Sequence, residues 1–147
     1  MRLSSICIVP IVLIGYIIKK NNFLSMIEHT TMHVSDYEKA RAFYTAALRP
    51  LGYKLTMEFA PDAAGFMADG HTSFWIACKP VPKGGGHVAF RAKNKDAVKK
   101  FYDAALAAGG EDNGAPGLRK DYSPDYYAAF VFDPDGNNIE AVCFESF

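Results

Sequence analysis

The chain has 147 residues, half of them hydrophobic, which is enough for one domain with a substantial core. Lys and Arg together number 16, as do Asp and Glu together, so the formal net charge is zero. This charge balance argues against nucleic-acid binding and favours a small-molecule partner. Three widely spaced cysteines (Cys7, Cys78 and Cys143) speak against a disulfide framework and a cysteine-rich zinc site, and favour a reducing compartment such as the cytoplasm.

The first 25 residues differ in composition from the rest. An apolar run at 6–18, interrupted by Pro10 and Gly15 and followed by Lys19, is shorter than the roughly 20 residues that a membrane-spanning helix needs. Three explanations stay open: translation starts at Met26 and the extension 1–25 is mis-assigned, the extension is a membrane anchor or uncleaved signal, or it is a structural element. Membrane contact is expected only if the extension is real.

The next segment predicts a strand followed by a helix. Residues 27–34 alternate with period two and place His29 on the face that looks away from the helix. Ser35, with Glu38 three residues on, predicts a capping box that begins a helix. Turn residues then separate three short predicted strands, at 53–59, 64–67 and 73–78.

The second half begins the same way after a linker rich in Pro and Gly. Residues 87–92 predict a strand that starts at His87, and Asn94 predicts the cap of a helix over 95–108. Residues 111–124, rich in Gly, Pro and Asp, predict a loop. Two more strands, 126–132 and 138–144, are predicted on either side of an Asp-Pro-Asp-Gly turn.

These halves repeat one another at a fixed offset. The offset places His29 on His87 and the helical sequence FYTAAL (43–48) on FYDAAL (101–106) without a gap. The repeat predicts an α+β fold of two βαβββ modules within a single domain at 26–147. Module one comprises 26–79 and module two 86–146.

The repeat also predicts a metal site. Two histidines at equivalent positions are a natural pair of ligands, and aligning the last strands places Glu140 opposite Trp75 or Phe74. Two imidazoles and one carboxylate suit a single divalent ion, Zn, Ni, Mn or Fe(II), with coordination positions open to substrate oxygens. Glu140 is also the candidate catalytic group, because a carboxylate beside the ion can move a proton.

Three motifs resemble the vicinal oxygen chelate superfamily, which includes glyoxalase I, extradiol dioxygenases, fosfomycin-resistance thiol transferases and metal-free bleomycin-resistance proteins. They are His-x-x-x-x-Val-x-Asp-x-x-x-x-x-x-Phe-Tyr at 29–44, Gly-His-Val-Ala-Phe at 86–90, and Asp-Pro-Asp-Gly-Asn-x-Ile-Glu at 133–140. The resemblance covers residues 26–146. It implies paired βαβββ modules that form an open, barrel-like sheet with a metal-binding cleft.

The resemblance carries the metal ligands over to His29, His87 and Glu140. The fourth ligand of glyoxalase I would fall in the strand that holds Phe74 and Trp75, neither of which can bind a metal. The leading expectation is a glyoxalase-like metal-dependent lyase or isomerase that acts on a small substrate with neighbouring oxygens. An Fe(II) extradiol-type dioxygenase and a metal-free drug- or metabolite-binding protein are the alternatives.

Four further residues are candidates for substrate binding. Trp75, Tyr122 and Tyr127 supply aromatic surface close in sequence to the predicted ligands, and Arg119 could hold a substrate anion. A homodimer is expected. Both modules of one chain could form each site, or two chains could exchange modules, so that His29 of one chain meets His87 and Glu140 of the other.

Overall fold

The computed structural model describes residues 27–80 and 84–144. The extension 1–25, with its proposed alternative start or membrane anchor, lies outside the described residues. None of the helices within 27–80 and 84–144 has the length and hydrophobicity that crossing a membrane requires.

Module one is a four-stranded mixed sheet with one helix. Its strands run in the spatial order β1-β4-β3-β2, and β1 is parallel to β4 while the other pairs are antiparallel. The elements are β1 (Thr30–Val34), α1 (Tyr37–Leu48), a short 3-10 helix η1 (Arg49–Leu51), β2 (Lys54–Phe59), β3 (Ala63–Ala68) and β4 (His71–Cys78).

The cap of helix α1 differs from the predicted capping box. Asp36 is the N-cap residue, and its carboxylate accepts a hydrogen bond from the backbone N–H of Lys39 at 3.1 Å. Ser35 instead bonds to module two: its backbone N–H donates to Asp135 Oδ2 at 2.9 Å, and its hydroxyl donates to Oδ1 of the same carboxylate. Ser35 is therefore hydrogen-bonded to Asp135 of module two, and Asp36 caps the helix in its place.

Module two repeats the architecture. Its sheet order is β5-β8-β7-β6, again with the first strand parallel to the last. The predicted cap is confirmed, because the Asn94 side chain accepts a hydrogen bond from the N–H of Ala97 at 2.9 Å. The elements are β5 (His87–Arg91), α2 (Lys95–Ala107), β6 (Glu111–Leu118), β7 (Tyr126–Phe132) and β8 (Asn138–Phe144).

The strand β6 occupies most of the segment that the sequence predicted to be a loop. It lies at the edge of its sheet, where Pro and Gly are tolerated because one side of the strand has no partner among the described strands. Its pairing with β7 shifts register on both sides of Gly114, whose φ of +148° is accessible to glycine. Turn-type composition thus marks an irregular edge strand here.

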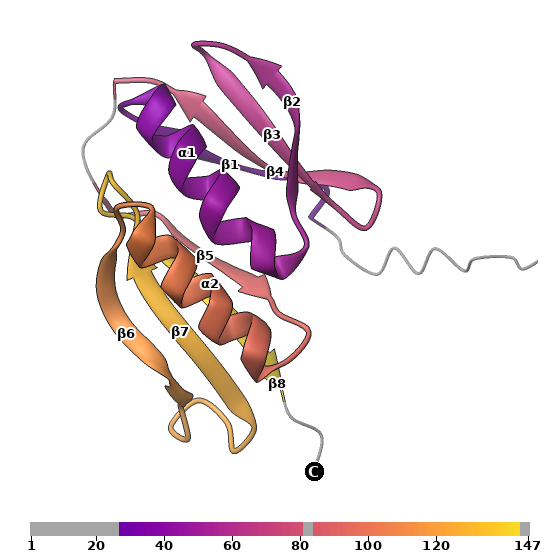
Figure 1. Cartoon of the computed structure of the whole chain (residues 1–147), viewed down its shortest axis with the longest axis vertical. Coiled ribbons are helices and arrows are strands. Elements are labelled where there is room, and N and C mark those ends of the chain that lie inside the picture. The colour runs from indigo at the N-terminus through magenta and orange to yellow at the C-terminus, as the bar shows by residue number, and fades with distance from the viewer. Residues whose placement is uncertain (1–26, 81–83, 145–147) are drawn as a thin grey trace, which may run out of the picture.

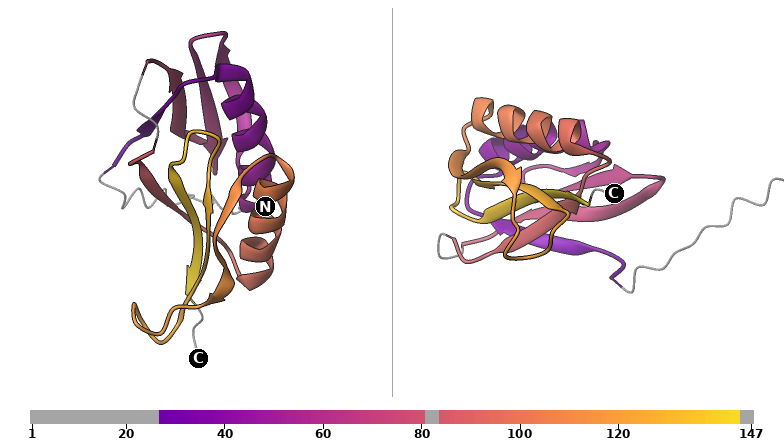
Figure 2. Two further views of the ribbon diagram at one scale, coloured as in Figure 1. Left: turned by 90° about the vertical axis from the view of Figure 1, so that its left-hand side faces the viewer. Right: turned by 90° about the horizontal axis from the view of Figure 1, so that it is seen from below.

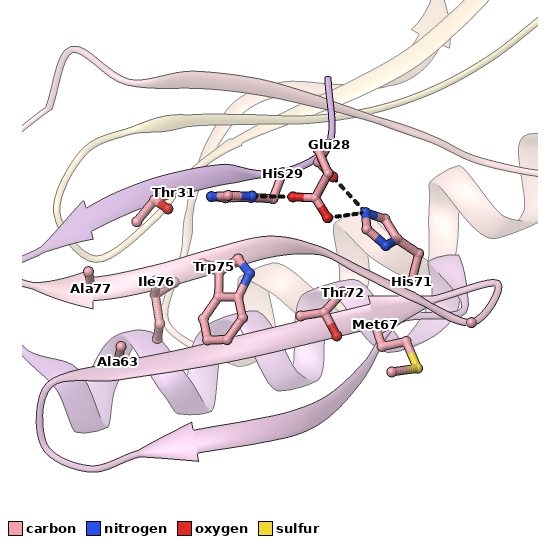
Figure 3. A pocket seen from close by; sticks show the side chains of 11 residues that line it. Glu28, His29, Thr31, Ala63, Met67, His71, Thr72, Trp75, Ile76 and Ala77 are labelled. Carbon is pink, nitrogen blue, oxygen red and sulfur yellow. Dashed lines mark hydrogen bonds and ion pairs between the residues drawn. The ribbon is translucent and has the colours of Figure 1, made fainter. Parts of the chain in front are cut away.

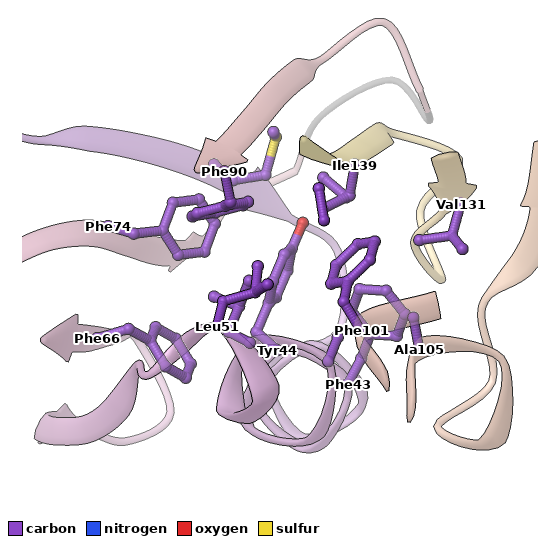
Figure 4. Packing of buried hydrophobic residues seen from close by; sticks show 14 of the residues in the cluster. Phe43, Tyr44, Leu51, Phe66, Phe74, Phe90, Phe101, Ala105, Val131 and Ile139 are labelled. Atoms are coloured by element: carbon purple, nitrogen blue, oxygen red, sulfur yellow. The ribbon is translucent and has the colours of Figure 1, made fainter. Parts of the chain in front are cut away.

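The two helices lie on one side of the molecule and the strands on the other (Figures 1 and 2). One hydrophobic core spans both modules: Phe43 and Tyr44 from α1 pack with Phe101 from α2 (Figure 4). The rings of Phe74 on β4 and Phe90 on β5 meet edge to face, with centroids 5.0 Å apart. The two modules therefore share one hydrophobic core.

The Asp-Pro-Asp-Gly-Asn turn between β7 and β8 joins the modules through buried polar contacts. The Asp133 carboxylate accepts hydrogen bonds from the Tyr44 hydroxyl of module one at 2.6 Å and from the backbone N–H groups of Asp135 and Asn137 at 2.9 and 2.8 Å. The Asn137 side chain in turn accepts from Gly86 N at 3.1 Å. This motif thus has a structural role at the module boundary.

Candidate functional site

His87 and Glu140 meet on the face of module two that looks away from α2. The residues Ala89 and Glu140 are register partners on β5 and β8, and His87 lies two residues before Ala89, on the same face. The His87 Nε2 atom lies 3.4 Å from Glu140 Oε2. Glu140 is 2 % exposed, so its carboxylate is removed from bulk water.

The orientation of the His87 ring is set by the backbone. Its Nδ1 donates to the carbonyl oxygen of Asn138 at 3.1 Å, so in the neutral imidazole Nε2 carries the lone pair. That lone pair lies beside a carboxylate oxygen, which is also an acceptor. A cation between the two atoms, either a proton or a metal ion, would satisfy both.

Tyr126 contacts the other oxygen of this carboxylate. Its hydroxyl donates to Glu140 Oε1 at 2.6 Å. Burial, followed by this hydrogen bond, raises the pKa of Tyr126 to about 12, so the phenol keeps its proton and remains a donor at neutral pH. Oε1 is therefore engaged, while Oε2 faces His87.

A small apolar cluster surrounds the pair on the same face of the sheet. It consists of Ala128, Phe130 and Val142, with Tyr126 packed against them, and it is separate from the main core. The Arg119 guanidinium lies 5.4 Å from the centroid of the Phe130 ring, so this predicted anion-binding residue is on the side of the sheet that carries Glu140.

The two predicted tyrosines lie in different places. Tyr122 is 66 % exposed and packs edge to face against Tyr126, with centroids 5.3 Å apart. Tyr127 points to the opposite side of the sheet, where its ring belongs to the main core and lies 5.1 Å from the ammonium group of Lys95. The period-two alternation of β7 thus places Tyr126, rather than Tyr127, beside Glu140.

His29 lies on module one, where it contacts Glu28. Its Nδ1 donates to Glu28 Oε2, and His71 approaches Oε1 of the same carboxylate at 3.2 Å (Figure 3). His71 Nε2 also donates to the backbone carbonyl of Glu28 at 2.7 Å. The hydrogen bond from His29, with smaller contributions from the charges of both histidines, lowers the pKa of Glu28.

Trp75 lines a pocket next to His29. The pocket, of about 570 Å³, lies on the face of module one turned away from α1 (Figure 3). Trp75 pairs in register with Thr31 on β1 and with Gly65 on β3, and its ring stacks on that of Phe59 at a centroid distance of 6.3 Å. The repeat aligns Thr31 with Ala89, whose partner is Glu140, so Trp75 rather than Phe74 holds the position equivalent to Glu140.

The donor chemistry fits a divalent ion, because two imidazoles and a carboxylate are ordinary ligands of Zn, Ni, Mn and Fe(II). Of the three predicted ligands, only His87 and Glu140 are in contact within a single chain. Across residues 27–80 and 84–144, no three His, Cys, Asp or Glu side chains gather closely enough to hold an ion. His29 therefore does not join the other two predicted ligands within one chain.

Sequence reasoning missed the contacts of Glu28 with His29 and His71. The parallel register pairs Thr30 with Phe74, so the residues before these two, Glu28 and His71 among them, come close together. This proximity depends on which strand of the sheet β1 joins, which periodicity alone does not reveal. Only the position of Glu28 directly before His29 could have indicated a supporting role.

Comparisons with known proteins agree with this architecture. The family model described as "Glyoxalase/Bleomycin resistance protein/Dioxygenase superfamily" matches residues 26–141. No curated protein matches the sequence. A glyoxalase/bleomycin resistance protein from Albidiferax ferrireducens T118 is 28% identical, with a TM-score of 0.68 over 80% of this chain and 98% of that chain.

Two further solved structures share the fold at lower identity. A glyoxalase/bleomycin resistance protein/dioxygenase family enzyme from Burkholderia phytofirmans PsJN is 18% identical, with a TM-score of 0.62 over 80% of this chain and 98% of that chain. A glyoxalase-related enzyme from Fulvimarina pelagi is 17% identical, with a TM-score of 0.63 over 81% and 88%. The paired βαβββ modules and the family match together place this chain in the glyoxalase/bleomycin resistance protein/dioxygenase superfamily.

Proposed function

We propose that the protein is a glyoxalase-like, metal-dependent lyase or isomerase that acts on a small substrate with neighbouring oxygens. The observation that carries the proposal is the contact between His87 and Glu140. The imidazole Nε2 faces a buried carboxylate oxygen at 3.4 Å, while its Nδ1 is fixed by the Asn138 carbonyl. Two acceptors held together in this way form a partial site for a cation.

The ring of His29 is also oriented by a hydrogen bond from its Nδ1 atom. Its Nδ1 donates to Glu28, which leaves Nε2 as the free coordinating atom of the neutral ring. Carboxylate support of a histidine ligand is a common arrangement around metal ions, because it fixes both the tautomer and the ring orientation. Each module thus presents one histidine whose Nδ1 is already engaged.

We further propose that two chains complete each site. His29 of one chain would join His87 and Glu140 of another, which requires a homodimer with two equivalent sites. The separation of His29 from the other two side chains supports this arrangement over a site formed by one chain alone.

The residues around Glu140 suit proton transfer. When bound, the ion would polarise neighbouring substrate oxygens and make an adjacent C–H proton more acidic. Glu140, or a water bound beside it, would accept that proton and return it to the product, while the Tyr126 hydroxyl donates to Oε1 and orients the carboxylate. The apolar cluster beside it excludes water, which strengthens these polar interactions.

A complementation experiment tests the ligand set and the pairing together. Chelator-treated protein is titrated with Zn²⁺, Ni²⁺, Mn²⁺ and Fe²⁺, and the bound equivalents are measured by calorimetry and elemental analysis. His29→Gln and Glu140→Gln should each abolish tight binding. Equal co-expression of the two variants should restore about a quarter of the wild-type sites, since half of the dimers are mixed and each mixed dimer has one intact site.

Two results would count against this proposal. No restoration in the mixed sample, with both variants folded and dimeric, would contradict a site shared between chains. Failure of the wild-type protein to bind any of the four ions would contradict the metal-dependent function itself. If binding is found, loss of a glutathione hemithioacetal indicates the lyase, and oxygen uptake with catechols would instead indicate the Fe(II) dioxygenase, which uses the same donor types.

A metal-free binding protein is the second candidate. The pocket of about 570 Å³ beside Trp75 supports it, because this pocket is formed by one chain and does not include Glu140. Under this alternative the protein would bind a small molecule with unchanged affinity in the presence of a chelator.

A further inference from the structure

The pocket on module one combines an aromatic platform with a polar edge. Ala63, Met67 and Trp75 provide its apolar surface, while His29 and Thr72 are among the polar residues at its border (Figure 3). An apolar cavity of about 150 Å³ is sufficient for benzene. A pocket of about 570 Å³ therefore has room for a ring together with polar substituents.

Gly65 allows the Trp75 ring to lie flat across the sheet. A Cβ at this position would come within 2.9 Å of two atoms of the indole ring, Cη2 and Cζ3, and equally close to the Thr72 methyl group. Phe59 stacks on the indole with an interplanar angle of 20°. Gly65 thus leaves room for the indole on the sheet, and the Phe59 ring packs against it.

We propose that this pocket binds the flat aromatic group of the ligand, with the ligand's oxygens directed toward His29. The proposal rests on the proposed function for the role of His29 and adds the class of substrate: a small molecule that carries an aryl group beside its pair of neighbouring oxygens. An extended aromatic surface selects a flat ring over a branched aliphatic chain, because rings stack in offset or edge-to-face contact. The Met67 thioether adds a soft contact of the kind that sulfur makes with ring edges.

Trp75 supplies a direct readout, because it is the single tryptophan of the chain. Styrene glycol and propylene glycol are neutral, carry the same pair of neighbouring hydroxyls, and differ in a phenyl or a methyl group. Both are titrated into chelator-treated protein while indole emission is recorded. Styrene glycol should change the emission saturably and bind at least about tenfold more tightly than propylene glycol, because more apolar surface is buried.

Two variants beside Trp75, compared with one control, test whether the phenyl group of the ligand binds in this pocket. Phe59→Leu removes the stacking partner of Trp75 and should weaken styrene glycol several-fold, as should Gly65→Ala, whose methyl group displaces the indole. Phe144→Leu is the control, since it makes the same change at a partly exposed aromatic residue of module two and leaves Trp75 in place. Circular dichroism confirms that each variant is folded.

Three results would overturn the proposal: equal affinity for the two glycols, no response of the indole, or a greater loss of affinity in Phe144→Leu than in Phe59→Leu. The chelator keeps this test separate from the proposed function. A protein that binds styrene glycol but no metal ion would retain the aromatic pocket and lose the metal-dependent enzyme. A protein that binds an ion but not the ring would retain the enzyme and lose the substrate class.

Discussion

Trp75 and Glu140 occupy the same position in the two sheets. Each lies on the last strand of its module, opposite the residue two places after the module's first histidine: Thr31 for Trp75 and Ala89 for Glu140. The indole of Trp75 stacks on Phe59, whereas the carboxylate of Glu140 accepts a hydrogen bond from the Tyr126 hydroxyl. The repeat has thus kept its backbone register while the chemistry at this position has diverged.

A carboxylate introduced at position 75 should therefore strengthen metal binding. In Trp75→Glu the new side chain would share the face and strand position that Glu140 has in module two, next to the module that supplies His29. We expect ion affinity to rise about tenfold by calorimetry, because a second carboxylate adds a fourth donor to the two imidazoles and Glu140. Trp75→Gln introduces a side chain of nearly the same shape as glutamate but without its charge, and should not show the gain in affinity. Equal affinities in the two variants would contradict a role for this position in the metal site.

Glu28 should support His29 from outside the coordination shell. Its carboxylate accepts the Nδ1 proton of His29, and His71 contacts it from the other side. Removing such a partner commonly weakens metal binding by about 10- to 100-fold, so Glu28→Ala should lie in that range by calorimetry. Glu111→Gln changes an exposed carboxylate at the start of β6 and is expected to bind as tightly as the parent. A Glu28→Ala protein with parental affinity would show that His29 needs no such support.

Sequence periodicity was sufficient for most of the fold. The gapless repeat around His29 and His87 predicted two equivalent modules, and alternating burial along β5 confirms that His87 looks away from the helix while Phe90 enters the core. Local composition was misleading in the segment 111–124, because Gly and Pro are compatible both with a loop and with an edge strand. Pairing with β7, a tertiary contact, decides between them.

The candidate site was less predictable for the same reason. The proximity of His87 and Glu140 follows from the parallel pairing of β5 with β8, a tertiary contact that the repeat did not predict. The contact of Ser35 with Asp135 joins residues far apart in sequence, so the local capping signal gave the wrong N-cap. Strand phase, had it been extended through β7, would have identified Tyr126 in preference to Tyr127 as the neighbour of Glu140.

The Asp133 carboxylate should contribute substantially to stability. It is 4 % exposed and accepts hydrogen bonds from Tyr44, from two backbone N–H groups, and from the Asn137 side chain at 3.0 Å. Since its loss leaves several buried donors unsatisfied, Asp133→Ala should lower the free energy of unfolding by about 3 kcal/mol or more in urea titrations. Asp96→Ala removes an exposed carboxylate from its pair with Lys100 and should cost about 0.5 kcal/mol or less. Similar losses in the two variants would contradict a structural role for the turn.

The same contact predicts a loss of stability in alkaline solution. Burial, and then the nearby Asp133 carboxylate, raise the pKa of Tyr44 well above its ordinary value. Because the folded pKa is raised, the contribution of Tyr44 is fully present below the unfolded pKa of about 10 and is lost as the pH rises above it. The free energy of unfolding of the parent should therefore fall from pH 9 to pH 11 more steeply than that of Tyr44→Phe, which has no phenol to ionise. Tyr122→Phe, a change at an exposed phenol, should keep the parental slope. Parallel slopes for the parent and Tyr44→Phe would show that ionisation of Tyr44 is not coupled to unfolding.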